Sequence, residues 1–313
     1  MAAILFAVYY HYPKPSFGKV VQFQPKTKEQ VCLLMVGDVG SGKPAQHDVA
    51  TLMNTIAQKH AVDAIVFAGD NFINHGVTDI HDILWQERFH SVYSLPNIKN
   101  IPVFAILGNH DYAGNAQAQI DYTKVSAGRW NMPARHYSVS FGNIAQVACI
   151  DTNFPDRSGL GILPLDKVEQ QLRTSKIPWK IVVGHRPLYS GGIYSSIQAH
   201  LKIILERFLD SCNADVYFSG HDHCQQHIPF VPFLGKREIQ QIVAGCGGSD
   251  LRDIELIHKK ALYTANSHGV VRVTLTSQKA EFCFHVVGAS EPAYSFSLSR
   301  EEKNGHTNRF RLN

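Results

Sequence analysis

Short apolar runs that stop at a glycine recur along this chain of 313 residues. They occupy 32–36, 64–68, 103–107, 180–183 and 216–219, and each is followed by a glycine and then by Asp, Asn or His. The last of these runs ends in the polar residue Ser219. An apolar run of this length that ends in glycine is typical of a buried strand that stops at a turn. The pattern therefore predicts five strands that bring polar side chains to the same end of one sheet.

The segments between these runs carry helical and antiparallel patterns. Helices are predicted near 45–60, 79–94, 165–175 and 197–211. A Gly-Asn pair at 142–143 joins two alternating segments and predicts a hairpin over 137–150. Antiparallel strands are predicted at 239–244, 269–275 and 281–287. Together these elements predict an α/β fold in which two packed mixed sheets are flanked by helices.

One domain is expected over 31–298, because no linker rich in proline, serine or charge divides this part of the chain. Residues 1–30 are expected to form a separate N-terminal segment. Its apolar run at 2–10 is too short to span a bilayer and lacks a basic n-region, but it is compatible with a degenerate signal or anchor. Residues 299–313 are polar and are expected to form a frayed tail.

Composition restricts the partners of the chain. The 30 Lys and Arg residues exceed the 26 Asp and Glu residues by only four and are scattered, which is too weak a positive charge to imply an anionic membrane as a partner, and no nucleic-acid partner is expected. The six cysteines form no CxxC pair and mostly lie in or beside apolar runs. Buried free thiols are therefore favoured over disulfides.

The glycine-rich segment at 37–44 is a near miss to the phosphate-binding P-loop. That loop needs Ser or Thr after its lysine, because the hydroxyl binds Mg²⁺. Pro44 stands there and has neither a hydroxyl nor a backbone N–H. We therefore expect Pro44 to be the first residue of a helix, and we do not expect a nucleotide-binding P-loop.

The polar residues at the ends of the five runs form a set that can build a two-metal hydrolytic centre. Each motif alone is also typical of a turn beside a hydrogen-bonded histidine. Five such motifs in order, each at a strand end, favour a metal centre over coincidence. The candidate ligands are Asp38, Asp70, Asn109, His185, His221 and His223.

In order and spacing, the motifs at 69–72, 108–111, 184–185 and 220–223 resemble those of the calcineurin-like metallophosphoesterases. Within that superfamily they resemble the purple acid phosphatases of the small, tartrate-resistant type, as do the segments 114–120 and 129–133. The resemblance covers about residues 30–290. It implies the four-layer metallophosphoesterase fold, two sheets with outer helices, which agrees with the fold predicted above.

The resemblance also implies a role for each candidate. Asp38 and His223 would bind the first metal, Asp70 would bridge both metals, and Asn109, His185 and His221 would bind the second. His110 would not be a ligand, but would steady the transition state or protonate the leaving group.

The chain departs from the family pattern at the first metal. Purple acid phosphatases carry a metal-binding tyrosine three residues after the bridging aspartate, where this chain has Ile73, and many colourless relatives carry a histidine where it has Gly40. Phenolate favours Fe(III), so its loss makes Fe(III) less certain and leaves Fe, Zn and Mn as candidates. His75 is a replacement ligand or a loop histidine. Arg186 replaces a family aromatic and is either a contact for substrate phosphate or a surface arginine.

These features predict a binuclear metal-dependent phosphatase that acts on phosphate monoesters of small molecules. The alternatives are a phosphodiesterase or nucleotide-processing metallophosphoesterase, and a binding protein whose catalytic centre has decayed. We expect a monomer without a stable membrane span. A secreted or periplasmic location is favoured by the family resemblance, and a cytoplasmic one stays open.

Overall fold

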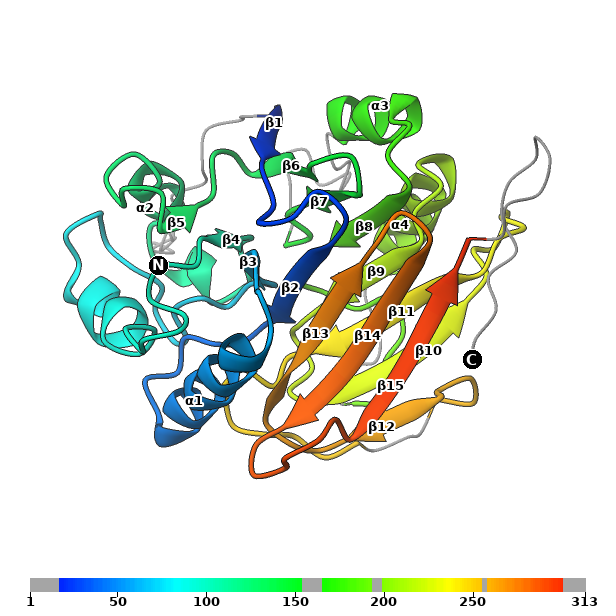
Figure 1. Ribbon diagram of the computed structural model, residues 1–313. Helices are drawn as coiled ribbons and strands as arrows, with labels where there is room; N and C mark the ends of the chain where they lie inside the picture. Colours follow the sequence, from blue (N-terminus) through cyan, green and yellow to red (C-terminus); the bar gives the residue numbers. More distant parts are fainter. Residues whose placement is uncertain (1–16, 154–164, 193–198, 255–257, 301–313) are drawn as a thin grey trace, which may run out of the picture.

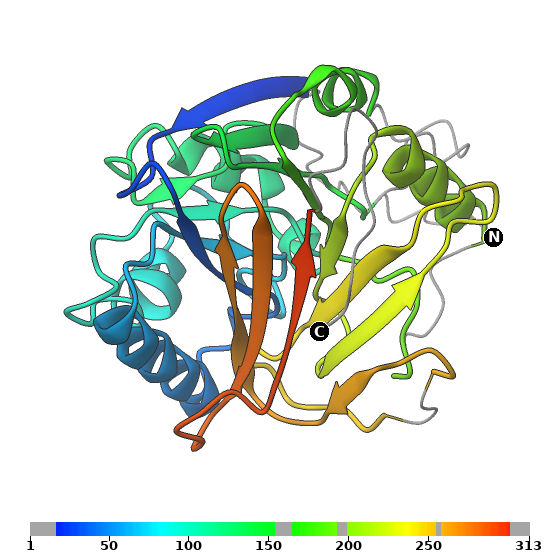
Figure 2. The same ribbon diagram turned by 45° about the vertical axis from the view of Figure 1, so that its right-hand side comes forward.

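Two mixed β-sheets packed face to face form the centre of the protein (Figure 1). The computed structural model describes residues 17–153, 165–192, 199–254 and 258–300. Helices cover the outer faces of the two sheets, so the chain folds into four layers (Figure 2). The α/β fold with two packed mixed sheets that was predicted from the sequence is confirmed.

One sheet has seven strands in the order β15-β14-β13-β2-β3-β4-β5. Strands β2 to β5 pair in parallel, and β13, β14 and β15 continue the sheet with antiparallel pairings. The strand bounds are β2 Val31–Val36, β3 Ala64–Phe67, β4 Val103–Ala105, β5 Trp130–Asn131, β13 Gly269–Leu275, β14 Lys279–Val286 and β15 Tyr294–Ser299.

The other sheet has eight strands in the order β1-β6-β7-β8-β9-β11-β10-β12. Strands β7, β8, β9 and β11 pair in parallel, whereas β6 with β7 and β10 with β11 are antiparallel. The strand bounds are β1 Phe17–Phe23, β6 His136–Phe141, β7 Ala145–Cys149, β8 Trp179–Val183, β9 Val216–Ser219, β10 Gln225–Phe230, β11 Ile239–Ala244 and β12 Tyr263–Ala265.

Helices lie over both sheets, and the apolar side of a helix such as α1 or α3 packs against the sheet beneath it. The helical elements are α1 Pro44–Lys59, the π-helix η1 Trp85–His90, the 3₁₀ turn η2 Asp111–Ala113, α2 Ala116–Tyr122, α3 Asp166–Thr174 and α4 Ala199–Ser211. Helix α1 begins at Pro44 as expected, because proline needs no N–H partner in the first turn. Its Val49 and Met53 pack into the core of the seven-stranded sheet.

Strand β8 shows how side chains alternate between the two sides of a sheet. Trp179, Ile181 and Val183 pack into the core between the sheets. Val182 points the other way, into a second apolar core beneath α3 and α4. The metal-ligand candidates that follow such strands are therefore held by backbone that is buried on both faces.

The five apolar runs do not lie in one sheet, so that part of the prediction is wrong. β2, β3 and β4 belong to the seven-stranded sheet, and β8 and β9 belong to the eight-stranded sheet. A strand that is buried on both faces is apolar at every position. Its sequence therefore shows no alternation of apolar and polar residues, and does not indicate which strands pair with it. The sheets meet where β2 ends, because Gly37 N donates to the Ala244 carbonyl over 2.8 Å.

Two further elements differ from the prediction. The helix expected near 79–94 is a series of turns around the π-helix η1, in which Ser91 N donates to the Gln86 carbonyl. The eight-stranded sheet also includes residues before residue 31, where the domain was expected to begin, because β1 pairs in parallel with β6. Val21 and Phe23 of β1 pack against the core, while the residue between them is exposed.

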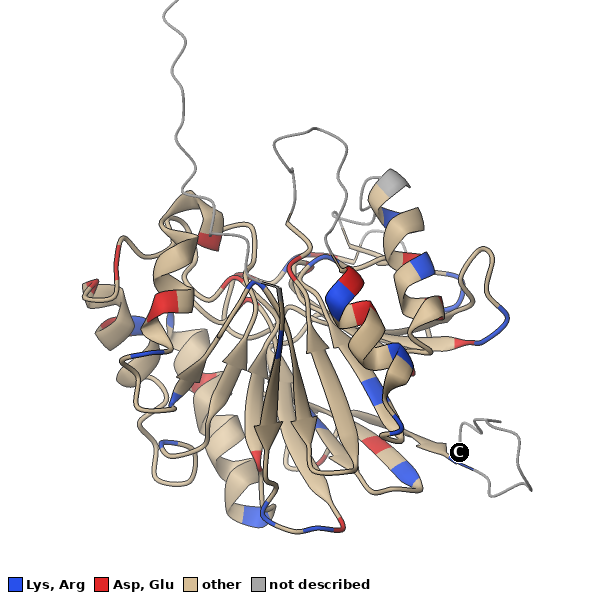
Figure 3. Ribbon diagram, turned by 90° about the horizontal axis from the view of Figure 1, so that it is seen from above, with Lys and Arg blue, Asp and Glu red and all other residues tan. Residues whose placement is uncertain are grey.

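Charged residues lie mainly on helices and loops, and acidic and basic residues are interspersed (Figure 3). No helix in the described part of the chain is long and apolar enough to cross a membrane. All six cysteines are buried and free, as the sequence predicted.

Candidate metal centre

The loops that follow β2, β3, β8 and β9 converge at the place where the ends of the two sheets meet. Asp38 N donates to the Gly69 carbonyl over 2.9 Å, and Gly220 N donates to the His185 carbonyl over 3.0 Å. His221 N reaches across the two sheets to the Asp38 carboxylate at 2.8 Å. These hydrogen bonds connect the ends of the strands to one another beneath the candidate ligands.

Three of the candidate ligands have an unusual backbone conformation. Asp38, Asp70 and His221 have φ values of 59°, 53° and 68°, in the left-handed region that side chains other than glycine rarely adopt. Each directly follows the glycine that ends a strand. Conformations of this kind cluster at functional sites, where the surrounding contacts hold them in place.

Glycine before these residues allows the close approach of the loops. A Cβ on Gly69 would lie 2.6 Å from Nδ1 of His185, and φ at Gly69 is 88°. A Cβ on Gly108 would lie 2.1 Å from the Asp70 carboxylate. The glycine at the end of each of these strands therefore does more than allow the turn. Its lack of a side chain leaves the space that the neighbouring candidate ligand occupies.

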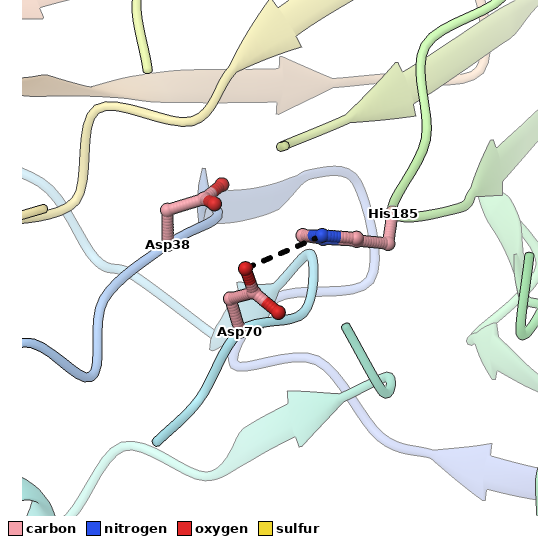
Figure 4. Close-up of side chains that lie close together, drawn as sticks. All are labelled: Asp38, Asp70 and His185. Atoms are coloured by element: carbon pink, nitrogen blue, oxygen red, sulfur yellow. Dashed lines mark ion pairs between the residues drawn. The ribbon is translucent and has the colours of Figure 1, made fainter. Parts of the chain in front are cut away.

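Asp38, Asp70 and His185 form the centre of the site, and all three are buried (Figure 4). One ligand atom of each lies within 4.8 Å of those of the other two. His185 Nε2 lies 3.5 Å from Asp70 Oδ2. Carboxylate and imidazole groups gathered at this spacing can share a metal ion.

The other three candidates surround this centre. His185 Nε2 lies 3.1 Å from Asn109 Oδ1 and 3.2 Å from His221 Nδ1. On the other side, His223 Nε2 lies 3.3 Å from Asp38 Oδ1. The structure thus brings together all six side chains that the sequence singled out. His223 lies beside Asp38, whereas Asn109 and His221 lie beside His185. The assignment of each side chain to one of two metals stays a prediction.

Backbone carbonyls hold two of the imidazole rings in orientation. The Ala68 carbonyl lies 2.8 Å from His185 Nδ1, and the Asp250 carbonyl lies 2.6 Å from His223 Nδ1. A carbonyl can only accept a hydrogen bond, so each Nδ1 carries the proton. Each Nε2 is then the ring atom that faces the carboxylates, and a metal ion bound there would take the place of its proton.

Electrostatics in the site also suit a cation. Burial raises the pKa of Asp70, but His185 and His110 outweigh it and hold that pKa well below its usual value. Burial lowers the pKa of His185, but Asp70 outweighs it and raises the pKa to about 9. Burial, His185 and Arg186 together lower the pKa of His221 far below its usual value, so its ring stays neutral.

The buried donors fit a metal pair. Asp38 Oδ1 is buried and makes no hydrogen bond of good geometry with the described residues, although His223 Nε2 lies 3.3 Å away, so this oxygen keeps the capacity to bind a cation. Two carboxylates, one amide oxygen and three imidazoles also suit divalent first-row metals such as Zn, Mn and Fe(II).

His110 lies at the edge of the site, where solvent reaches it. Its side chain is 33% exposed, and its Nε2 lies 3.9 Å from Asp70 Oδ2. Its backbone N donates to Asp70 Oδ1 over 2.8 Å, which ties the loop after β4 to the loop after β3. The ring is therefore near the centre without being part of the buried group of Asp38, Asp70 and His185, and its role stays a prediction.

The two uncertain candidates differ in their surroundings. Arg186 lies beside the cluster, with Nη1 3.0 Å from His221 Nε2. His75 is exposed, and no hydrogen bond or ion pair among the described residues joins its side chain to the cluster. Its role as a replacement ligand stays a prediction.

Sequence reasoning gave no role to two residues that support the site. Asp111 is fully buried and accepts hydrogen bonds from Gly108 N over 2.7 Å and Phe72 N over 3.1 Å, which fixes both ligand loops. Thr152 Oγ1 accepts from His185 N and Arg186 N, each over 3.0 Å. Asp111 stands in the 108–111 motif, but its partners are distant in sequence and no local pattern identifies them.

Comparison with known proteins places this site in a family. Residues 33–225 match the family described as calcineurin-like phosphoesterase. The chain belongs to the calcineurin-like phosphoesterases. It is 30% identical to Purple acid phosphatase 3 of Arabidopsis thaliana, over 82% of this chain and 75% of that protein. It is also 30% identical to Tartrate-resistant acid phosphatase type 5 of Sus scrofa, over 58% of this chain and 57% of that protein. The branch that the sequence motifs resembled, the purple acid phosphatases, is confirmed.

Solved structures of calcineurin-like phosphoesterases and their relatives share the fold. GAP50, described as the anchor in the inner membrane complex of Plasmodium, superposes with a TM-score of 0.76 at 26% identity, covering 88% of this chain and 90% of that one. Purple acid phosphatase PPD1 from yellow lupin gives a TM-score of 0.70 at 17% identity, covering 88% of this chain and 55% of that one. At that identity the second likeness concerns the fold alone.

Gly40 and Ile73, the two positions at which this chain departs from the expected ligand pattern, lie side by side. Ile73 N donates to the Gly40 carbonyl over 2.9 Å, and Arg88 Nη1 donates to both carbonyls, over 2.7 Å to Ile73 and 3.0 Å to Gly40. A Cβ on Gly40 would lie 2.0 Å from the carbonyl oxygen of Asn71. The loop therefore leaves no space for any side chain at position 40, including a histidine ligand.

Gly40→Ala is expected to destabilise the protein, because the new Cβ would force the backbone at Asn71 to move. We expect the free energy of unfolding to fall by about 1–3 kcal/mol, the range for overpacking. Urea unfolding followed by circular dichroism measures the change. An unfolding curve equal to that of the wild type would contradict the tight packing of the two loops.

Proposed function

We propose that this chain is a two-metal phosphatase that hydrolyses phosphate monoesters of small molecules. The observation that carries the proposal is the buried group of Asp38, Asp70 and His185, whose ligand atoms lie within 4.8 Å of one another in a calcineurin-like phosphoesterase. Asp38 and His223 would hold one metal, Asp70 would bridge both, and Asn109, His185 and His221 would hold the other.

The residues around the cluster suit phosphate ester hydrolysis. When bound, a metal pair neutralises charge on the phosphoryl oxygens and lowers the pKa of the water that attacks phosphorus. His110 is solvent-accessible beside Asp70 and would protonate the leaving group or steady the transition state. Arg186 would contact the substrate phosphate, because its guanidinium lies against His221 at the edge of the cluster.

A substrate panel together with metal analysis tests this function. The purified protein should contain about two metal ions per chain and hydrolyse an aryl monoester faster than the corresponding diester. A faster rate with the diester or with nucleotide substrates would replace the proposal with a phosphodiesterase or nucleotide-processing activity. The same metal pair supports all of these reactions, so the substrates decide between them.

A binding protein with a decayed centre is the second candidate. It is favoured by the likeness to GAP50, a protein described as an anchor, and by the absence of a tyrosine at position 73. Full retention of the six candidate ligands argues for the enzyme. Protein that holds no metal after incubation with Zn, Mn or Fe, and that hydrolyses no ester, would favour the binding protein.

The enzyme is expected to be colourless even when it is loaded with iron and active. Ile73 supplies no phenolate, so no phenolate-to-iron charge-transfer band should arise. Divalent pairs should support activity, because the hard anionic ligand that favours Fe(III) is missing. Visible absorption spectra of the iron-loaded protein measure this. A purple wild-type protein would mean that another tyrosine reaches the metal.

A further inference from the structure

A basic cavity of about 380 Å³ lies at the start of strand β8, away from the candidate metal centre. We call it the basic pocket. Four of the residues that line it are cationic, namely Lys176, Lys180, Arg237 and Arg300. The others are Ser175, Ile177, Pro178 and Asn213, so no carboxylate lines it among the described residues.

One buried carboxylate lies beneath these four cations. Asp215 is 1% exposed and accepts from Arg237 over 3.1 Å and from Arg300 over 2.7 Å. Its second oxygen also accepts from Lys180 N over 2.9 Å. Among the residues that the structure describes, four cations therefore gather around this cavity with Asp215 as the carboxylate beneath them.

Lys180 is the cation whose position most needs an explanation. It is only 9% exposed, yet among the described residues no hydrogen bond or ion pair satisfies its Nζ. Its neighbours Trp179 and Ile181 face the core between the sheets, so the Lys180 side chain faces the opposite side, into the pocket. Burial lowers the pKa of its amino group, against the pull of Asp215.

The two arginines are held in place before any ligand binds. Arg300 stacks over the Trp179 ring, 4.4 Å from its centroid, and donates to the Pro178 carbonyl. Arg237 donates to the Ala214 carbonyl over 3.0 Å. Guanidinium groups fixed in this way lose little conformational freedom on binding an anion, which favours affinity.

We propose that the basic pocket binds a small anion that carries two or more phosphate groups. Four cationic side chains line the pocket in the described part of the chain, more than one phosphate group needs as partners, and the volume lies in the range of small-molecule sites. Lys180 is the second residue of β8, and His185 follows the other end of that strand by two residues, so the two side chains lie at opposite ends of β8. The pocket is therefore separate from the metal centre, and a phosphorylated lipid headgroup and a soluble polyphosphate share the chemistry it recognises.

Calorimetric titration of the full chain with inorganic pyrophosphate tests the proposal. The wild type should show two binding processes, one at the metal centre and one at the pocket. Lys180→Met should weaken only the second by roughly 10- to 100-fold, the value of a charged hydrogen bond, and should keep wild-type phosphatase activity. Lys124→Met is the control, because Lys124 is an exposed lysine elsewhere on the surface.

Asn213→Asp gives a second variant that should keep the fold, because Asn213 is exposed and aspartate tolerates its φ of 53°. The new carboxylate at the pocket should weaken the same binding process at least about 10-fold. Pyrophosphate titrations of both variants that match the wild type would overturn the proposal. So would a wild type with no binding process outside the metal centre.

Vesicle sedimentation distinguishes the two sources of the anion. Vesicles of phosphatidylcholine with a bisphosphorylated inositol lipid should sediment the protein, and pyrophosphate should release it, if the ligand is a lipid headgroup. Calorimetric binding of pyrophosphate without sedimentation assigns the pocket to a soluble anion. Absence of both rejects the pocket as a polyphosphate site.

Discussion

Asp70→Asn is expected to reduce phosphatase turnover by on the order of 10⁴-fold or more, the range for removal of one member of a catalytic unit. Asp70 is buried in the group it forms with Asp38 and His185, whose ligand atoms lie within 4.8 Å of one another, and its carboxylate lies 3.5 Å from His185 Nε2. An amide offers one neutral oxygen in place of two anionic ones, so it cannot hold two cations together. Initial rates with an aryl monoester, together with the metal content per chain, measure the effect.

The fold should survive this substitution, because asparagine matches aspartate in size and also tolerates the left-handed backbone at position 70. Circular dichroism should therefore be unchanged. Asp48→Asn is the matched control, since Asp48 is an exposed carboxylate on α1 and should keep full activity. Near-normal turnover in the Asp70 variant would remove Asp70 from its proposed role.

The candidate ligands could be predicted from the sequence because each stands at a fixed offset from an apolar run. A buried run and a terminal glycine predict a strand end without knowledge of the sheet, and functional side chains gather at strand ends. This logic located Asp38, Asp70 and His185 although it assigned their strands to one sheet instead of two. The site lies where the sheets meet, so the error in topology left the ligand set unchanged.

Other features could not be predicted because they depend on distant partners. Strand β10 contains Gln225, Gln226 and His227, whose polarity is not typical of a buried strand. It is nevertheless buried, because partners such as Gln240, 2.8 Å from His227 Nε2, satisfy these side chains. The supporting role of Asp111 is hidden for the same reason, since its donors come from loops and a helix elsewhere in the chain.

The basic pocket was also invisible in the sequence. Lys180, Arg237 and Arg300 are far apart along the chain, and each looks like one of many scattered cations. Only the fold brings them together around Asp215, from β8, the loop before β11 and the end of β15. The weak net charge of the chain gave no information on cations that gather around one cavity.

His110→Ala is expected to lower kcat by roughly 10²–10⁴-fold, the contribution of a general acid or base, without loss of metal. The position of the His110 side chain supports a role in proton transfer that is separate from metal binding. Its ring is 33% exposed and lies 3.9 Å from Asp70, outside the buried group that Asp38, Asp70 and His185 form. Elemental analysis of the variant should therefore give the metal content of the wild type.

The leaving group distinguishes the two proposed roles of His110. If the imidazole protonates the leaving oxygen, the loss of kcat should be large for an alkyl phosphate and small for an aryl phosphate whose phenol needs no proton. If it steadies charge on the phosphoryl group, both substrates should lose activity equally. His47→Ala, at an exposed histidine of α1, is the control and should leave both rates unchanged. Metal loss in the His110 variant would instead make His110 a ligand, and would assign its solvent-facing ring to the metal centre rather than to proton transfer.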